Sequence, residues 1–270
     1  MPAVDSIFAR GLFDGQVAIV TGGGTGIGLQ TARELGWLGA RVAIGSRKQE
    51  NIDAGLADLK GLGVDAHGAL LDVREPEQCE AFVQAVLERW GKVDVLVNNA
   101  GGQFPSPAQH ITPRGWEAVI RNNLNGLFYM TLATAKLAML PKKRGRIVNV
   151  IAEIARGFPG MVHTGAARAG VENMTKTLAV EWASSGIRVN SCAPGTITSS
   201  GTLRYGESAL ELSRRATPLK RYGTVEEVSR VLVFLASDRN DFVTGSTYYI
   251  DGGKSLWGDV WPIEEPPPPT

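Results

Sequence analysis

The residues best suited to chemistry lie in one glycine-rich stretch, residues 19–28, which reads Ile-Val-Thr-Gly-Gly-Gly-Thr-Gly-Ile-Gly. An apolar run precedes this stretch and a helical pattern follows it, so we expect a buried strand to turn sharply into a helix. Such a turn needs glycine where φ is positive and where a ligand meets bare backbone. Unpaired N–H groups at the start of the helix would then bind a phosphate. The predicted contacts come from Gly22, Thr25, Gly26, Ile27 and Gly28.

The end of the next predicted strand, residues 46–48, indicates which dinucleotide would bind. A site for NAD carries an acidic residue about 20 residues after the glycines, where it holds the ribose hydroxyls. This sequence has Ser46, Arg47 and Lys48 there and no carboxylate. Arginine offers a planar fork to a 2′-phosphate, so the sequence predicts NADPH as the cofactor. A solvated basic helix start is the alternative interpretation.

Asp72 and Val73, which directly follow the third predicted strand, are expected to flank the adenine. The alternative for Asp72 is that it only caps the following helix. The glycine stretch has an alternative as well. Its spacing, Gly22-x-x-x-Gly26-x-Gly28, is not that of the usual dinucleotide fingerprint, and a glycine-rich run can be no more than a tight turn.

Composition excludes several classes of function. The chain has 270 residues and a formal net charge of +1, so no basic field gathers nucleic acid. Its three histidines and two cysteines show no metal-ligand spacing, and no metal is expected. No segment has the apolar length of a membrane span, and the N-terminus lacks a signal-peptide core. We therefore expect a cytoplasmic protein that acts on a small molecule.

Strand and helix patterns alternate regularly, which predicts a single-domain Rossmann-type α/β fold, a doubly wound parallel sheet flanked by helices. Residues 198–221 are polar and irregular and are predicted to be a substrate lid. Residues 254–270 are predicted to be an extended C-terminal tail. Predicted strands span residues 17–20, 41–45, 66–71, 93–97, 146–151, 188–192 and 247–250. Predicted helices span residues 29–38, 50–62, 75–90, 115–140, 164–183 and 224–236.

Six motifs in a fixed order give this sequence a likeness to one family. They are Thr21-Gly22-x-x-x-Gly26-x-Gly28, Asp72-Val73, Asn98-Asn99-Ala100-Gly101, Asn123, Pro194-Gly195 and Asp251-Gly252-Gly253. The chain resembles the short-chain dehydrogenase/reductase family over nearly its whole length. The resemblance implies that Asn99, Ala100 and Gly101 border the adenosine side of the cofactor. It also implies that the turn at Pro194 and Gly195 holds the nicotinamide amide through the backbone of Ile197, and that the protein is a homo-oligomer, in particular a tetramer.

The sequence departs from this family at its catalytic residues. Members usually carry Tyr-x-x-x-Lys on the helix after the fifth strand, with a serine about a dozen residues earlier. Four-residue spacing places both groups on one helical face. Here Thr164 stands at the tyrosine position and Arg168 at the lysine position, while the serine position falls at Ile151 or Ala152. All three side chains are therefore replaced.

These replacements narrow the reaction. Reduction of a ketone makes an alkoxide that an acid must protonate, and threonine is too weak an acid while arginine stays protonated. Hydride addition to an α,β-unsaturated thioester makes an enolate, which needs only hydrogen-bond donors at its oxygen. We therefore predict an NADPH-dependent reductase of the C=C bond of a trans-2-enoyl thioester. Thr164, Arg168 and Asn123 would organise the oxyanion, and Arg168 would also bind the nicotinamide ribose.

A local resemblance supports this prediction, and two alternatives stay open. Residues 101–108, 157–159 and 163–171 are similar to peroxisomal trans-2-enoyl-CoA reductases. One alternative is an alcohol or carbonyl oxidoreductase with another acid, and the other is a non-catalytic NADP-binding protein. His163 is a candidate proton donor, with a structural or solvated histidine as the alternative. Glu153 is a candidate base or water ligand, with an exposed carboxylate as the alternative.

Overall fold

The computed structural model describes residues 4–199, 206–257 and 262–264. Its centre is a seven-stranded parallel sheet in the order β3-β2-β1-β4-β5-β6-β7. Strands β1, β4, β5 and β6 are buried along their whole length, as expected of parallel strands covered on both faces. The strands are β1 Val17–Thr21, β2 Arg41–Ser46, β3 Ala66–Leu70, β4 Val95–Asn98, β5 Gly145–Val150, β6 Ile187–Pro194 and β7 Thr247–Ile250.

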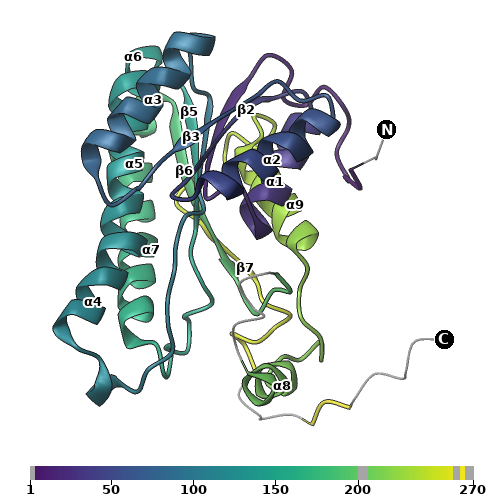
Figure 1. The fold of residues 1–270 in the computed structure, drawn as a ribbon. Helices are drawn as coiled ribbons and strands as arrows, with labels where there is room; N and C mark the ends of the chain where they lie inside the picture. Colours follow the sequence, from purple (N-terminus) through teal and green to yellow (C-terminus); the bar gives the residue numbers. More distant parts are fainter. Residues whose placement is uncertain (1–3, 200–205, 258–261, 265–270) are drawn as a thin grey trace.

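Helices cover both faces of the sheet, and Figure 1 shows α1, α2 and α9 on one side and α3, α5 and α7 on the other. Each layer packs its own apolar core. Leu35 and Leu232 belong to the core under α1 and α9, while Phe82 and Met130 belong to the core under α3 and α5. The helices are α1 Gly26–Trp37, α2 Gln49–Gly61, α3 Pro76–Trp90, α5 Gly126–Thr134, α7 Val162–Glu181 and α9 Val225–Ala236.

The predicted architecture is confirmed. Every expected strand is present, and so is every expected helix except that over residues 115–140, with ends that differ by a few residues at most. The order of the strands reverses between β1 and β4, so the carboxyl ends of the strands form a crevice at that point. Among the described residues, no helix combines the length and the apolar character that a membrane span requires.

The helix predicted over residues 115–140 is interrupted twice. α4 (Pro113–Ile120), α5 and α6 (Leu140–Lys142) are joined by two π-helical turns, η2 (Arg121–Asn125) and η3 (Ala135–Met139). A π-turn inserts a residue into the helix and rotates the side chains that follow it. The first turn contains Asn123, which is fully buried against the crevice.

The predictions for residues 198–221 and 254–270 need correction where the structure describes them. The first segment is not irregular, since it contains α8 (Glu207–Arg215), whose Glu211 pairs with Arg214 and Arg215 one turn later. The second segment begins with a turn, in which the Leu256 N–H donates to Gly253 O. Residues 200–205, 258–261 and 265–270 lie outside the described residues, so the lid and the extended tail stay predictions.

Candidate active site

The turn between β1 and α1 has the backbone that a phosphate site needs. Gly22 and Gly26 have φ of +64° and +55°, the left-handed region that favours glycine. A Cβ at Gly28 would lie 2.4 Å from Asn99 Nδ2, so a side chain there is excluded. A Cβ at Gly26 would meet only Ser199, at 3.8 Å, so the turn is open on that side.

Helix α1 begins at this open side of the turn. Its N-cap residue, Thr25, makes no side-chain cap, and its first turn has no acidic residue. The N–H groups of Gly26, Ile27 and Gly28 precede the first helical bond, which the Leu29 N–H donates to Thr25 O. Free N–H groups and the positive end of the helix dipole together bind anions. The turn therefore fits the diphosphate of a nicotinamide dinucleotide.

Residues at the end of β4 fasten the glycine turn to the sheet. The N–H groups of Asn99 and Ala100 both donate to Thr21 Oγ1 at 3.0 Å, and Asn99 Nδ2 donates to Thr21 O at 3.0 Å. Asn98 Nδ2 donates to Thr131 Oγ1 and to Asn149 Oδ1. Residues 98–101 thus fix the position of the glycine turn relative to the sheet. The expectation that they border the adenosine stays a prediction.

The basic end of β2 contains one cation that is available for a phosphate. Ser46 Oγ accepts the Lys48 N–H at 3.3 Å, and Lys48 Nζ pairs with Glu50 at 3.2 Å on the surface. Arg47 is exposed and donates no hydrogen bond to a described residue. Of the two predicted cations, Arg47 is therefore the better candidate for a 2′-phosphate.

Asp72 and Val73 lie beside this end of β2, with their side chains engaged by the protein. Asp72 Oδ1 accepts both the Nε–H and the backbone N–H of Arg74, and these bonds hold the pKa of the carboxyl below its usual range. The N-cap of α3 is Glu75, so the capping alternative for Asp72 is wrong. Val73 is buried, and a Cβ at Gly126 would lie 2.7 Å from its Cγ2. Only the main chain of Val73 is left to face an adenine.

Arg168 is the charged group at the centre of the crevice. It lies on α7, is 6% exposed, and places one guanidinium N–H 3.4 Å from Asn123 O. A Cβ at Gly101 would lie 2.4 Å from Arg168 Nη2, so glycine makes room for the guanidinium. Burial lowers the pKa of Arg168 to about 10, and the group stays charged at neutral pH. No carboxylate among the described residues pairs with it.

The side chain of Asn123 is fully engaged by the protein. Its Nδ2 donates to Gly102 O at 2.7 Å and to Val119 O at 2.9 Å, which uses both amide hydrogens. Its Oδ1 accepts the Gly102 N–H at 3.2 Å. Both amide hydrogens of Asn123 are thus used within the protein, and its part in organising the oxyanion stays a prediction. Asn123 ties η2 to the loop after β4 and offers its own carbonyl to Arg168.

Thr164 lies one turn before Arg168 on α7, as the spacing predicted, and it is fully buried. The Thr164 N–H donates to His163 Nδ1 at 2.8 Å, and Thr164 Oγ1 lies 3.3 Å from the same nitrogen. Because Nδ1 accepts, a neutral His163 carries its proton on Nε2. That atom is buried and has no hydrogen-bond partner among the described residues. Thr164 thus has one neighbouring acceptor that competes with a substrate oxygen.

The turn after β6 is held in place on both sides. Gly195 N–H donates to Ile250 O, and a Cβ at Gly195 would lie 2.8 Å from the Asp251 Cα. Ile197 forms a parallel bridge with Gly223 through the groups of its two chain neighbours. The N–H and C=O of Ile197 therefore lie on the edge of the bridge that faces away from Gly223. Binding of the nicotinamide amide there stays a prediction.

Two contacts in the site were missed or misjudged at the level of sequence. The Phe104 ring packs edge-on against His163, with centroids 4.7 Å apart, and no motif or period pointed to this pair. Glu153 is not an exposed carboxylate, because it is 8% exposed and its Oε1 accepts the Ala155 N–H at 3.1 Å. In the sequence, the signal for the burial of Glu153 was its place in the loop before α7, which also contains Phe158 and Pro159.

A family model described as Enoyl-(Acyl carrier protein) reductase matches residues 22–255. A probable 2,4-dienoyl-CoA reductase of Bacillus subtilis is 36% identical over 253 residues, which are 92% of this chain and 99% of the relative.

Solved structures give the same picture. A citronellol catabolism dehydrogenase (AtuB) of Pseudomonas aeruginosa PAO1 is 44% identical with a TM-score of 0.85, and the match covers 93% of this chain and 100% of that one. An actinorhodin polyketide ketoreductase with NADPH is 33% identical with a TM-score of 0.85, and the match covers 95% and 100%.

Proposed function

The chain belongs to the short-chain dehydrogenase/reductase family, and within it we propose an NADPH-dependent reductase of the C=C bond of a trans-2-enoyl thioester. Proteins of this family bind a nicotinamide cofactor and catalyse the oxidation or reduction of small molecules. The Bacillus subtilis relative is named for a dienoyl-CoA substrate, and the ketoreductase is named for a carbonyl. The choice between these chemistries therefore rests on the site of this chain.

The observation that carries the proposal is the pair of groups on α7. Thr164 and Arg168 replace the family's phenol and ammonium, and α7 contains no tyrosine. The loop between β5 and α7, residues 151–161, contains no serine. What is left is a buried hydroxyl and a buried guanidinium, which are hydrogen-bond donors. Such donors stabilise negative charge on an oxygen but do not transfer a proton to it. They therefore suit a reaction in which an enolate oxygen carries charge and the new bonds form at carbon.

The residues of the chain have separate tasks in this reaction. A bound reduced nicotinamide would supply a hydride to Cβ of the enoyl thioester. The C=C electron pair moves toward the thioester oxygen, where Arg168 N–H and Thr164 O–H stabilise the enolate. Cα then takes a proton from water, which restores the thioester carbonyl. Asn123 positions Arg168 through its backbone carbonyl, 3.4 Å from the guanidinium.

Arg47 supports NADPH as the cofactor. It is the exposed cation at the end of β2 that has no competing hydrogen bond in the described residues. A planar guanidinium binds phosphate through two parallel bonds. NADH lacks the 2′-phosphate and would gain nothing from this contact.

A panel of substrates separates the candidates by the loss of NADPH absorbance. We expect oxidation of NADPH with a crotonyl thioester, and none with an acetoacetyl thioester or a simple ketone. Reduction of the acetoacetyl thioester alone would replace the proposal by carbonyl chemistry. Tight binding of NADPH without turnover on any substrate would instead leave a nucleotide-binding protein.

A further inference from the structure

Glu153 is a buried carboxylate to which the proposed reaction gives no task. It lies just beyond the end of β5 and is 8% exposed. Its backbone N–H donates to Pro194 O at 2.9 Å, and its Oε1 accepts the Ala155 N–H at 3.1 Å. The main chain and one carboxylate oxygen are thus both held in place at the carboxyl ends of β5 and β6.

The second oxygen of this carboxylate is left over. Oε2 accepts no hydrogen bond from the residues that the structure describes, and no cation among them pairs with Glu153. A carboxylate has room for about four hydrogen bonds, and buried charges are normally paired. The loop alone does not explain the charge, because a neutral amide would accept the Ala155 N–H as well. Glu153 therefore keeps one oxygen available for a ligand.

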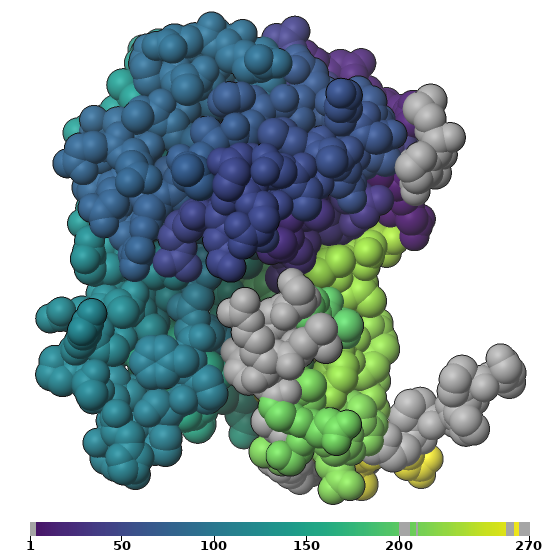
Figure 2. Space-filling view, viewed as in Figure 1, coloured from purple at the N-terminus to yellow at the C-terminus, as the bar shows by residue number. Residues whose placement is uncertain are grey.

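The carboxylate lines a cavity that begins beside Thr164. Glu153, Phe158 and Pro159 share the lining of this cavity, which opens between the loop before α7, helix α8 and the turn after β7. Figure 2 shows the molecule hollowed between its teal and green parts, where α8 lies. Phe158 also packs on the first turn of α7, since a Cβ at Gly165 would lie 3.2 Å from the Phe158 Cβ. Gly165 directly follows Thr164 in the chain, so a substrate held at Thr164 can reach Glu153 along Phe158.

The carboxylate and the predicted oxyanion donors are separate groups. The guanidinium of Arg168 donates to Asn123 O, and Thr164 Oγ1 has His163 Nδ1 as its neighbour. Among the described residues, Glu153 makes no bond with Arg168 or Thr164. The site thus offers hydrogen-bond donors for an oxygen and, apart from them, a base for a C–H proton.

We propose that Glu153 is a general base, and that the protein also moves the double bond of a 3-enoyl thioester to the 2-position. The inference rests on the proposed function, because Thr164 and Arg168 would hold the same thioester oxygen in both reactions. A carboxylate base beside an oxyanion hole is an arrangement that shifts a double bond toward a carbonyl. The product is the 2-enoyl thioester that the proposed reduction consumes.

The steps of this shift balance without a cofactor. The Glu153 carboxylate takes a proton from Cα, and the C–H electron pair enters a dienolate whose charge lies on the thioester oxygen, beside Arg168 and Thr164. The protonated carboxyl then gives this proton to Cγ, and the thioester carbonyl forms again. The double bond has moved from Cβ–Cγ to Cα–Cβ, and nothing is oxidised or reduced. Cα and Cγ are separated by one carbon atom, so one carboxylate serves both.

The test supplies but-3-enoyl-CoA to the protein saturated with NADP⁺, which has no hydride to give. We expect conversion to crotonyl-CoA, followed by NMR. In Glu153→Gln this conversion should fall about 100-fold or more, the scale of a lost general base. Reduction of crotonyl-CoA by NADPH should fall far less, because its Cα proton comes from water, so the ratio of the two rates should drop at least about tenfold.

The variant is matched to the question. Glutamine keeps the shape of Glu153 and an oxygen for the Ala155 N–H, so it removes the base and leaves the loop. A fluorescence titration with NADPH measures whether the cofactor site of the variant is intact. The control Glu117→Gln, at an exposed position of α4, should leave the ratio of the two rates unchanged.

The outcomes separate this proposal from the proposed function. Reduction of crotonyl-CoA by the parent protein, with no conversion of but-3-enoyl-CoA, would overturn the role of Glu153 as a base and keep the reductase. Conversion that is lost in Glu153→Gln, with no reduction of crotonyl-CoA by the parent, would keep the base and reject the reductase. An unchanged ratio of the two rates in Glu153→Gln, at unchanged affinity for NADPH, would also overturn the proposal.

Discussion

Arg168 carries a charge inside the protein with little to balance it. The guanidinium has one backbone acceptor, Asn123 O, and no carboxylate among the described residues. Removing such a charge from water costs several kcal/mol, and a bound ribose and a substrate oxygen would supply the missing acceptors. The cofactor-free site is therefore less stable than it could be, and binding offsets that cost.

The variant Arg168→Met tests whether the buried charge lowers the stability of the cofactor-free protein and raises its affinity for NADPH. Removal of the charge should raise the Tm of the cofactor-free protein by about 2 °C or more per kcal/mol gained. It should weaken NADPH binding about tenfold or more, because the donors are lost. Calorimetry and a fluorescence titration measure the two effects. Arg168→Lys is the control, since it keeps a charge without the planar fork, and it should lose turnover with no gain in Tm. Loss of both Tm and binding in the methionine variant would contradict this account.

Thr164→Val removes one donor at nearly constant shape. We expect kcat on a crotonyl thioester to fall about 100-fold, the scale of one lost oxyanion donor. Thr177→Val is the matched control, because Thr177 lies exposed near the other end of α7 and bonds only to Asn173 O. A Thr164→Val enzyme as fast as the parent would show that the hydroxyl does not touch the reacting oxygen.

Single residues were predictable from sequence where spacing along one helix decides the answer. Thr164 and Arg168 are four residues apart, and the register alone placed them on one helix face. Asn123 was not predictable in the same way, because its amide is consumed by backbone carbonyls at Gly102 and Val119. The burial of Thr164 likewise depends on parts of the chain distant in sequence.

Elements, unlike residues, were found by their periodicity. Apolar runs located all seven strands, because parallel strands covered on both faces are mostly apolar in sequence. The π-turn η2 escaped prediction, since its shift is set by contacts such as Asn123 Nδ2 to Val119 O. Helix α8 escaped because it lies in a polar stretch. The spacing of Glu211 with Arg214 and Arg215 was the signal for it.

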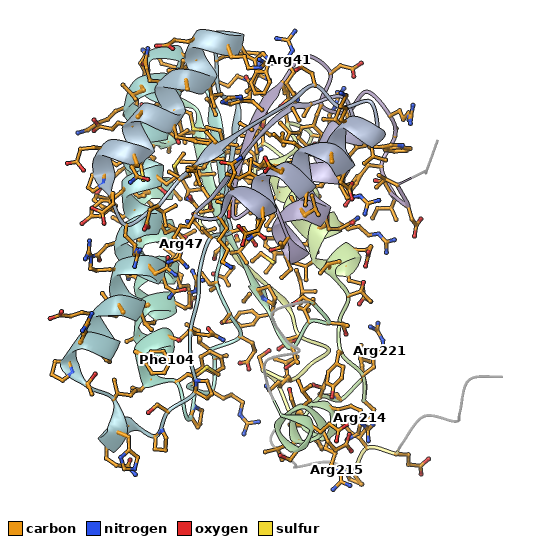
Figure 3. All side chains as sticks on the ribbon, in the orientation of Figure 1. Arg41, Arg47, Phe104, Arg214, Arg215 and Arg221 are labelled. Carbon is orange, nitrogen blue, oxygen red and sulfur yellow. The ribbon has the colours of Figure 1, made fainter. Side chains whose placement is uncertain are left out.

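The end of β2 should decide the choice of cofactor. We expect NADPH to bind at least about tenfold more tightly than NADH, which is about 1.4 kcal/mol. Arg47→Ala should weaken NADPH and leave NADH nearly unchanged, and fluorescence titrations give both constants. Arg41→Ala is the control, because Figure 3 shows Arg41 far from Arg47, at the start of the same strand. Equal affinity of the parent for the two cofactors would remove the role given to Arg47.

At the scale of the whole molecule, large apolar side chains remain uncovered on two surfaces. Phe128 on α5 and Val180 on α7 are 38% and 79% exposed on the outer helical layer. Phe242 and Tyr249 are exposed beside β7, the edge strand of the sheet. Apolar surface of this kind marks contacts between chains more often than it marks free surface.

We predict a homo-oligomer, in particular a tetramer, as the family resemblance implies, and these exposed apolar side chains are candidates for the contacts between chains. Light scattering at micromolar concentration should give about four times the mass of one chain. Val180→Asp should reduce the mass, whereas Lys136→Asp, on an exposed polar position of η3, should not. A monomeric mass for the parent protein would contradict the prediction.

The most direct test of the proposed reaction is the position of the transferred hydride. NADPH that carries deuterium at the transferring C4 position is turned over with a crotonyl thioester, and the product is examined by NMR. The account predicts deuterium at Cβ of a saturated thioester, with the new hydrogen at Cα drawn from solvent, because Arg168 and Thr164 only stabilise the oxygen. Deuterium on a carbinol carbon, from a β-keto thioester or a ketone, would contradict it and would show ordinary carbonyl reduction.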